Sequence, residues 1–158
     1  MNTFQKFYTD NRERLFGYLL RKTGNYSLAA DITQESFTRY LERYRNREQS
    51  SALLFTISRH LLYDHTRKNC LNTLYDEERH GPDIDLEKAY TIKEEYKRVL
   101  NAMQKLSEET RDILALTVSS GLSYREIGDI TGNSEANIKV KIHRSRVKLK
   151  KILQQDRL

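Results

Sequence analysis

The sequence predicts an all-α protein of two small helical domains joined by an acidic, flexible linker. Apolar residues recur with the period of an α-helix in the first 69 residues, and again between residues 122 and 151. Between these parts, residues 70–92 contain 6 acidic and 2 basic residues and the only proline, with no sustained helical period. A structureless stretch of this length is uncommon inside one compact domain. We therefore expect domains at 1–69 and 93–158, with the linker at 70–92.

The first domain is expected to begin with two amphipathic helices. In the first, apolar residues recur at helical spacing: Phe4, Phe7, Tyr8, Leu15, Phe16, Tyr18, Leu19 and Leu20. In the second, N-Y-S-L-A-A-D-I-T-Q-E-S-F-T-R-Y-L-E-R-Y, the inward stripe comprises Leu28, Ile32, Phe37, Tyr40 and Leu41. Asp31, Gln34 and Glu35 fall outside that stripe and make a polar, partly acidic face. Composition alone is compatible with a binding face or with an ordinary solvated one.

A third helix is expected over S-A-L-L-F-T-I-S-R-H-L-L-Y-D-H-T-R-K, after the polar loop R-N-R-E-Q-S. Its inward positions are Leu54, Ile57, Leu61 and Leu62. Its expected exposed positions are Arg59, His60, Tyr63, Asp64, Arg67 and Lys68. Cations interleaved with an aromatic ring suit single-stranded or distorted nucleic acid, because the cations hold phosphate and the ring can stack on a base. Tyr63 fits a half-buried core position equally well.

The C-terminal domain is expected to contain a helix-turn-helix. Ser123 is placed as an N-cap and Glu126, three residues on, completes a capping box for the first helix. Gly132 in T-G-N-S can adopt a positive φ, so the chain can reverse within one short turn. Ser134 then caps a second helix.

The second helix is basic on its outer side. Ile138, Ile142 and Leu149 share one face and should pack on the first helix. The opposite side holds Ala136, Val140, His143, Arg144 and Val147, and seven Lys or Arg residues with no acidic residue lie between Lys139 and Lys151. A helix fits the major groove of B-DNA, and arginine can read guanine through two hydrogen bonds. Although a basic helix can be merely a solvated surface, the capped turn beside it favours DNA binding.

Composition narrows the class of protein further. The net charge of +6 suits a soluble protein with a polyanionic partner. No apolar run reaches the roughly 20 residues needed to cross a bilayer, and the first residues lack the apolar core of a signal peptide. We therefore expect a cytoplasmic protein without membrane insertion. A single cysteine, Cys70, excludes an intrachain disulfide and a cysteine zinc cluster.

Three segments in this order resemble the extracytoplasmic-function sigma factors, the small two-domain members of the bacterial sigma-70 family. A-A-D-I-T-Q-E-S-F-T-R-Y-L is similar to the family's region 2.1–2.2, and A-L-L-F-T-I-S-R-H-L-L-Y-D-H-T-R-K to its region 2.3–2.4. L-S-Y-R-E-I-G-D-I-T-G-N-S-E-A-N-I-K-V-K-I-H-R-S-R is similar to region 4.2. Their order, with an acidic linker between, is more specific than any one segment. The resemblance spans nearly the whole chain.

The resemblance implies a partner for each surface. Region 2.2 of the family docks on the largest catalytic subunit of RNA polymerase, so the core-binding candidates are Asp31, Gln34 and Glu35. Region 2.3–2.4 and the loop before it bind the promoter −10 element and capture an unstacked base. The candidates there are Asn46, Arg59, His60, Tyr63, Asp64, Arg67 and Lys68. Region 4.2 reads the −35 element, with candidates Lys139, Lys141, His143, Arg144 and Arg146. The acidic linker would thread toward the RNA exit channel.

The resemblance also implies regulation, and one motif departs from it. Members of the family are commonly held inactive by an anti-sigma factor, often membrane-bound. Where the family usually has R-A-W-L-F, this chain has S-A-L-L-F from Ser51 to Phe55 and contains no tryptophan. A bulky aromatic side chain that would assist strand opening is therefore missing, and Leu53 is expected to fill its place as packing.

Two other classes of protein compete with this interpretation. A stand-alone transcription regulator would bind an operator through the helix-turn-helix, as a symmetric dimer, without polymerase. An enzyme is suggested only by His60, Asp64 and His65, whose spacing could bring metal ligands near one helix face. No further cluster of histidines or carboxylates completes such a site. We therefore expect no catalytic residue, no metal and no cofactor.

Overall fold

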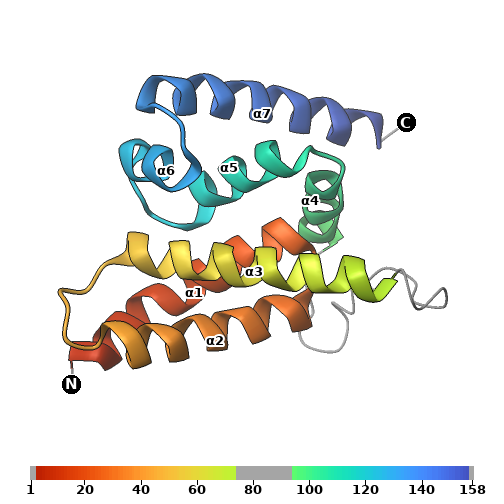
Figure 1. Cartoon of the computed structure of the whole chain (residues 1–158). Coiled ribbons are helices and arrows are strands. Elements are labelled where there is room, and N and C mark those ends of the chain that lie inside the picture. The colour runs from red at the N-terminus through yellow and green to blue at the C-terminus, as the bar shows by residue number, and fades with distance from the viewer. Residues whose placement is uncertain (1–2, 74–93, 157–158) are drawn as a thin grey trace.

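Figure 1 shows the computed structural model of the chain, which describes residues 3–73 and 94–156. Within these residues all regular secondary structure is helical, so the predicted all-α class is confirmed. In chain order the helices are α1 (Thr3–Thr23), α2 (Tyr26–Tyr44), α3 (Ser51–Thr73), α4 (Glu94–Gln104), α5 (Glu108–Ser119), α6 (Tyr124–Thr131) and α7 (Glu135–Gln155).

The N-terminal group of helices, α1 to α3, begins with a tight helical hairpin. Gly24 follows α1 with a φ of 65°, and the Asn25 side chain then accepts a hydrogen bond from the Leu28 amide at 3.0 Å. The predicted inward residues of α2 and α3 are all buried or half-buried: Leu28, Ile32, Phe37, Tyr40, Leu41, Leu54, Ile57, Leu61 and Leu62. The predicted inward faces of these two helices are therefore confirmed.

Aromatic packing inside this group fixes the start of α3. The Phe7 ring stacks on Tyr40 with 4.9 Å between centroids, and Phe37 meets Phe7 edge-on at 6.3 Å. The Tyr40 hydroxyl accepts a hydrogen bond from the Ser50 amide at 3.0 Å, immediately before α3. Leu53 is half-buried against the same core, so its expected role in packing is confirmed.

The third helix is longer than the sequence predicts. α3 continues to Thr73, whereas the acidic linker was expected to begin at residue 70. Cys70 is consequently an exposed helical residue. Residues 70–73 carry no charge, so the charge pattern that suggested the linker could not locate the end of this helix. The remainder of the expected linker, residues 74–92, lies outside the described residues.

The C-terminal group, α4 to α7, has a capping residue before three of its helices. The side chains of Ser107, Ser123 and Ser134 each accept a hydrogen bond from the backbone of the following turn. Glu126 also bonds back to the Ser123 amide at 3.0 Å. The predicted capping box and both predicted helix starts are therefore confirmed.

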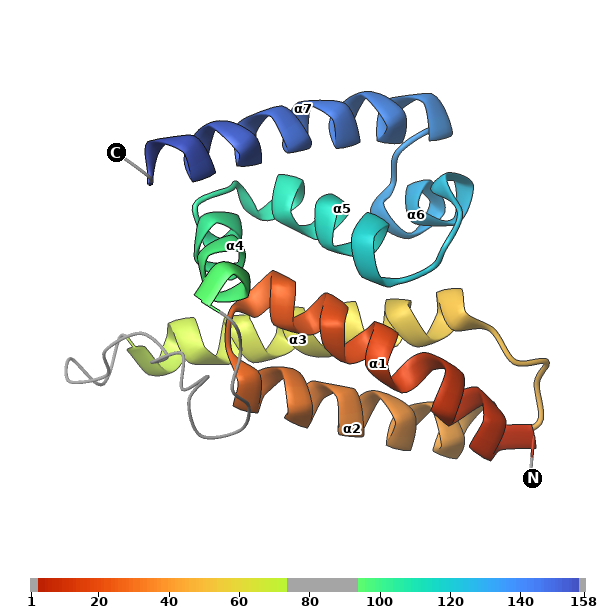
Figure 2. The ribbon, with the colours of Figure 1, turned by 180° about the vertical axis from the view of Figure 1, so that it is seen from behind.

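The two groups of helices pack against each other. α5 and α4 both contact α1, and α6 contacts α3. Figures 1 and 2, which are opposite views, place α7 on one outer side of the molecule and α2 on the other. Buried side chains from both groups belong to one apolar cluster. The region where α1 and α3 meet α4, α5 and α6 is called the seam below.

Candidate nucleic-acid interface

The turn between α6 and α7 depends on two glycines. Gly132 has a φ of 77°, and the Asn133 amide donates a hydrogen bond to the Gly128 carbonyl at 2.8 Å. A Cβ atom added at Gly128 would lie only 2.4 Å from the Asn133 carbonyl oxygen. The predicted reversal at Gly132 is confirmed, while Gly128 is a requirement that the sequence pattern did not single out. Together they set the angle at which α7 leaves α6.

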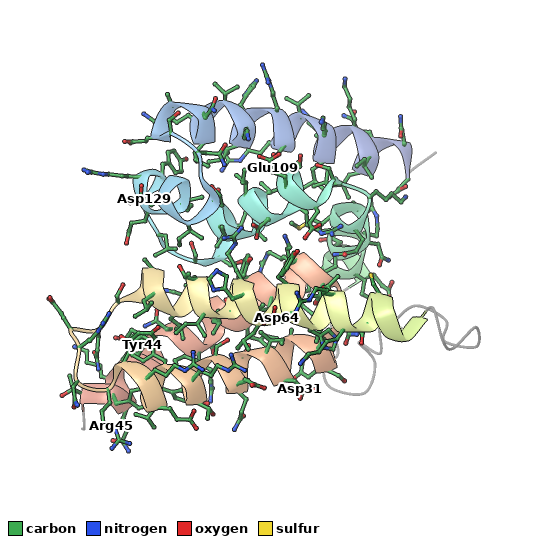
Figure 3. The ribbon with its side chains drawn as sticks, viewed as in Figure 1. Asp31, Tyr44, Arg45, Asp64, Glu109 and Asp129 are labelled. Carbon is green, nitrogen blue, oxygen red and sulfur yellow. The ribbon has the colours of Figure 1, made fainter. Side chains whose placement is uncertain are left out.

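The outer face of α7 is open to solvent. Ile138 and Ile142 are buried and Leu149 is half-buried, so the predicted inner face is confirmed. The exposed residues of the opposite side are Ala136, Lys139, Val140, His143, Arg144, Arg146 and Val147. Figure 3 shows side chains of α7 projecting from the outer edge of the molecule. A projecting helix with small residues and cations has the shape and charge to enter a major groove.

Lys141 differs from the other basic candidates of α7. Its amine forms an ion pair with Glu109 of α5 and donates to the Asn133 side chain at 2.8 Å. The residue is half-buried and ties α7 both to α5 and to the turn. In this arrangement Lys141 therefore holds α7 in place, and its amine is already engaged.

The acidic face of α2 points away from the C-terminal helices. Asp31, Gln34 and Glu35 are all exposed, and Figure 3 places Asp31 on the side of α2 remote from α5 and α7. Glu35 lies 3.4 Å from Arg39, one helical turn on, in an exposed pair of small energetic value. The three candidates thus form one accessible surface.

All −10 candidates but one are exposed, and for those on α3 this exposure was predicted. They are Asn46 in the loop after α2, and His60, Tyr63, Asp64, Arg67 and Lys68 on α3. Tyr63 is 65% exposed, which removes the alternative of a half-buried core residue. An exposed ring among cations can stack on an unpaired base.

Arg59 is the exception, because the sequence predicted an exposed side chain and the structure places it in the seam. Its Nε and one terminal nitrogen donate to Asp112 Oδ2 at 3.1 and 2.7 Å. Its other terminal nitrogen donates to the Ile130 carbonyl at 2.9 Å. The side chain is only 25% exposed. The expected exposure was wrong because helical periodicity cannot anticipate that another domain covers this position.

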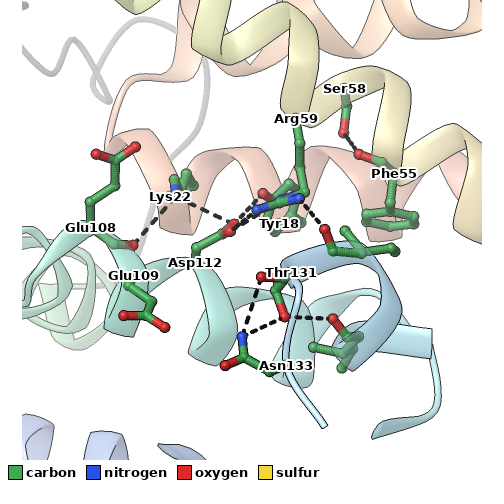
Figure 4. A network of polar contacts seen from close by, with 12 residues as sticks. Tyr18, Lys22, Phe55, Ser58, Arg59, Glu108, Glu109, Asp112, Thr131 and Asn133 are labelled. Carbon is green, nitrogen blue, oxygen red and sulfur yellow. Dashed lines mark hydrogen bonds and ion pairs between the residues drawn. The ribbon is translucent and has the colours of Figure 1, made fainter. Parts of the chain in front are cut away.

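Asp112 of α5 is the centre of a buried network at the seam (Figure 4). Its Oδ1 accepts a hydrogen bond from the Tyr18 hydroxyl at 2.5 Å and lies 3.3 Å from the Lys22 amine. Its Oδ2 accepts both bonds from Arg59, so each carboxylate oxygen has two polar contacts. We call Tyr18, Lys22, Arg59 and Asp112 the interdomain ion cluster. Three of its members come from α1 and α3, and the fourth comes from α5.

The pKa values within the interdomain ion cluster reflect burial and pairing. Burial alone would raise the pKa of Asp112, but Lys22 and Arg59 together with the Tyr18 hydrogen bond outweigh it and lower that pKa. Burial lowers the pKa of Lys22, and the attraction of Asp112 only partly offsets this. Burial and the neighbouring carboxylate both raise the pKa of Tyr18. The lowered pKa of Asp112 favours its ionised form beside the two basic side chains, and the raised pKa of Tyr18 favours the neutral phenol.

Sequence reasoning missed the roles of Asp112, Lys22 and Tyr18. A weak signal for Asp112 exists, because an acidic residue stands among the apolar residues Ile113, Ala115 and Leu116 on the buried side of α5. Charged residues are almost never fully buried unless they are paired. Such a residue therefore predicts a buried cation, although the sequence does not say which one.

Nothing in the described residues suggests a metal centre or a membrane span. Residues 3–73 and 94–156 contain no group of three or more histidines, cysteines and carboxylates arranged to hold a metal ion. Of the helices described, none has the combination of length and apolarity needed to cross a bilayer.

Two protein-family models match the chain, one for each group of helices. Sigma-70 region 2 matches residues 7–70, and Sigma-70, region 4 matches residues 96–149. The matched ranges include the candidates on α2, α3 and α7 and leave out most of the expected linker.

Individual proteins give the same result over almost the full length. The RNA polymerase sigma factor YlaC of Bacillus subtilis is 26% identical, covering 99% of this chain and 95% of that protein. The ECF RNA polymerase sigma factor EcfG of Rhodopseudomonas palustris is 28% identical over 90% of this chain and 80% of its own. SigM of Bacillus subtilis, also an ECF sigma factor, is 28% identical, covering 94% of this chain and 93% of that protein.

A solved structure shares the fold. The sigma factor RpoE from Bartonella quintana, crystallised with the anti-sigma factor NepR, superposes with a TM-score of 0.83 at 22% identity. The match covers 98% of each chain. Both groups of helices therefore have counterparts in that protein.

Proposed function

The chain belongs to the extracytoplasmic-function sigma factors of the bacterial sigma-70 family, and we propose how its surfaces divide the work of starting transcription. The protein binds core RNA polymerase through α2, the promoter −10 element through α3, and the −35 element through α7. It acts by binding in the cytoplasm and performs no covalent chemistry of its own. The observation that carries this assignment is the solvent-open basic face of α7, held at a fixed angle by the turn at Gly128 and Gly132.

The assignment of polymerase binding to α2 is supported by the charge and exposure of one surface. Asp31, Gln34 and Glu35 are exposed on a chain whose net charge is +6. An acidic patch on a basic protein suits a basic protein partner better than it suits DNA, because like charges repel. Its position on the outer side of the molecule leaves it accessible.

The two promoter elements would be recognised through different kinds of contact. On α7, Arg144 and Arg146 would read base edges or hold phosphates in duplex DNA, and Lys139 would hold phosphate. On α3, His60, Arg67 and Lys68 would hold the backbone of the opened −10 element while Tyr63 stacks on a base. Extracting a base from the duplex costs a few kcal/mol, which pocket contacts and the polymerase must offset.

Two weakly binding domains can act together because they belong to one chain. Once one domain engages the polymerase or the promoter, the second binds at a raised effective concentration. Neither domain then needs high affinity for DNA alone. We also propose that an anti-sigma factor controls the protein, since such inhibitors commonly hold members of this family.

Transcription in vitro tests the proposed function. Run-off transcription with bacterial core RNA polymerase on a genomic fragment library, with and without the protein, would locate its start sites. We expect new starts that share −35 and −10 elements at fixed spacing. If polymerase gains no starts while the protein alone retains duplex fragments, the protein is instead a stand-alone regulator.

A further inference from the structure

Few large apolar side chains are exposed in the part of the chain that the structure describes, and two of them lie on α7. Over residues 3–73 and 94–156 the exposed large apolar residues are Tyr63, Val118, Val140 and Val147. Val140 is 45% exposed and Val147 is 41% exposed. A half-exposed valine adds little to a core, and its β-branched side chain is a weaker helix former than alanine or leucine. Folding therefore gives no reason for valine at these two positions.

The two valines belong to one line of residues along the helix. The line has spacings of four, three and four positions, which keep its members on one side of an α-helix: Ala136, Val140, His143 and Val147. All four are exposed, and they lie opposite the buried Ile138 and Ile142. Figures 1 and 2 show α7 on the outside of the molecule, so no other helix covers this side. We call these four residues the outer stripe of α7.

Cations border the outer stripe on both sides. Lys139, Arg146 and Lys150 lie along one side of it, and Arg144 and Lys151 lie along the other. All five residues are exposed, and no acidic residue lies between Lys139 and Lys151. A line of largely apolar side chains between two rows of cations matches the major groove, because base edges form its floor and phosphates form both of its walls.

The dimensions of α7 bring Val140 to the floor of that groove. An α-helix with its side chains is about 10–12 Å across, and the major groove is about 12 Å wide. In a helix-turn-helix the N-terminal residues of the second helix contact the base edges. α7 begins at Glu135, so Val140 lies in its second turn. Val147 lies about 10 Å further along the helix and farther from the bases.

The floor of the major groove offers a valine one apolar group to recognise. Thymine presents its C5-methyl group there, whereas guanine and adenine present hydrogen-bonding atoms. Contact between a valine and that methyl group removes both apolar surfaces from water, which is favourable. Against a guanine or adenine edge, the same valine would displace water from acceptors without replacing its hydrogen bonds, which is costly. A valine at this position therefore favours thymine in two ways.

From this arrangement we propose that Val140 is a specificity-determining residue that recognises the C5-methyl group of a thymine in the −35 element. The inference rests on the proposed function and deepens it, because it names a base and the chemical group through which that base is chosen. Ala136, one turn earlier on the outer stripe, allows the helix to approach the base pair closely. The bordering cations bind phosphates on both strands and fix the register.

The same chemistry makes recognition sensitive to DNA methylation. 5-Methylcytosine carries a methyl group on the same ring carbon as thymine does, so it presents that group at the same place in the groove. At the position that Val140 contacts, 5-methylcytosine should therefore be bound better than unmodified cytosine. The hydrogen bonds of the base pair are the same with and without this methyl group, so the comparison isolates the apolar contact.

Removing the methyl group from the DNA tests the proposal. On a promoter located by the run-off experiment, each thymine of the −35 element is replaced in turn by deoxyuracil, which lacks only the C5-methyl group. One of these replacements should lower promoter binding by wild-type holoenzyme about 3- to 10-fold, as expected for one buried methyl group. With cytosine at that position, its C5 methylation should recover binding by a similar factor.

The variant Val140→Ser assigns the response to one residue. Serine has about the same helix propensity as valine and lacks both methyl groups, so the helix should be retained, which circular dichroism checks. Val140→Ser holoenzyme should bind the thymine and deoxyuracil promoters equally. Val118→Ser is the matched control, because Val118 is a 55% exposed valine on α5. Val147→Ser is a second control on the outer stripe itself. Both controls should respond to deoxyuracil as wild type does.

The outcomes separate this inference from the proposed function. If new starts appear but no thymine of the −35 element responds to deoxyuracil, or if Val140→Ser keeps the full response, recognition of the methyl group by Val140 is overturned and the proposed function stands. In the second case, equal weakening on both promoters would assign Val140 to a contact with protein. A −35 element without an A·T pair also overturns the inference. If core polymerase gains no starts, the proposed function is overturned and this inference with it.

Discussion

The outer faces of the molecule and its seam use charged residues in opposite ways. On α2 and α7 the charges project into solvent, and buried apolar residues on the reverse side of each helix hold the face in position. At the seam the charges turn inward, and Asp112 gathers cations from α1 and α3. An outer face is therefore open to a partner, whereas the charges of the seam are already paired within the chain.

The affinity for a partner and the shape of the free chain should therefore depend on different parts of the molecule. Substitutions on an outer face should change how tightly one partner binds without altering the shape of the free chain. Substitutions at the seam should change the shape of the free chain without removing a contact to the polymerase or to the −35 element. The predictions below use this distinction, beginning with the largest expected effect.

Charge reversal on the outer face of α2 should have the largest effect. Asp31→Lys with Glu35→Lys should abolish holoenzyme assembly, with core polymerase affinity falling by about 100-fold or more, because opposed like charges cost several kcal/mol at an interface. Fluorescence anisotropy with core polymerase measures this directly. Asp10→Lys with Glu13→Lys makes the same change in net charge on exposed positions of α1 and should bind normally. Equal loss in both variants would contradict a specific α2 interface.

The glycine turn that aims α7 should be the next most sensitive feature. Gly128→Ala places a Cβ atom 2.4 Å from a backbone oxygen and should cost about 3 kcal/mol of folding free energy. Gly132→Ala meets no atom within 4 Å and should cost only about 1 kcal/mol, for its positive φ. Urea denaturation compares the two variants. A smaller loss at Gly128 than at Gly132 would refute the steric account of the turn.

On α7, replacing an exposed cation should affect promoter selection more than replacing a cation that is paired within the chain. Arg144→Ala should lower discrimination between intact and altered −35 elements by about 1–3 kcal/mol, with core binding unchanged. Lys141→Met should affect discrimination less, because its amine is held by Glu109 and Asn133. Promoter competition in run-off transcription measures both variants. If Arg144→Ala leaves promoter selection untouched, the groove assignment of α7 is wrong.

Acid should weaken the contact between the two groups of helices at the seam. The pairing of Asp112 at the seam lowers its pKa below the ordinary value of about 3.9, so the carboxylate stabilises the contact between the two groups of helices above that value. This stabilisation is lost as the pH falls through the depressed pKa. Scattering between pH 7 and pH 3 should show expansion at the acid end in wild type, while Asp112→Asn should already be expanded at neutral pH. An acid response shared equally by both proteins would assign it to other carboxylates.

Local signals in the sequence predicted much of the fold. The Ser123 and Ser134 caps and Gly132 set helix boundaries through neighbours a few residues away, and all three behave as predicted. The buried faces of α2 and α3 followed from the helical period, because that period fixes which residues share a side. The end of α3 was missed because residues 70–73 carry neither a charge nor a helix-stopping residue.

The seam could not be predicted because its contacts join distant residues. Arg59 and Asp112 are 53 positions apart, and Tyr18 and Asp112 are 94 apart. Periodicity assigned Arg59 to the outward side of α3 and could not tell whether that side meets water or another domain. The candidate surfaces on α2 and α7 were predictable because no other part of the chain covers them.

The mixed character of the seam makes its strength depend on temperature. Apolar association, which α1 and α5 share through one cluster, weakens on cooling. The desolvation penalty of a buried ion pair falls as temperature rises. Both contributions change in the same direction, so warming should strengthen the contact between the two groups of helices until the helices themselves melt, and cooling should weaken it.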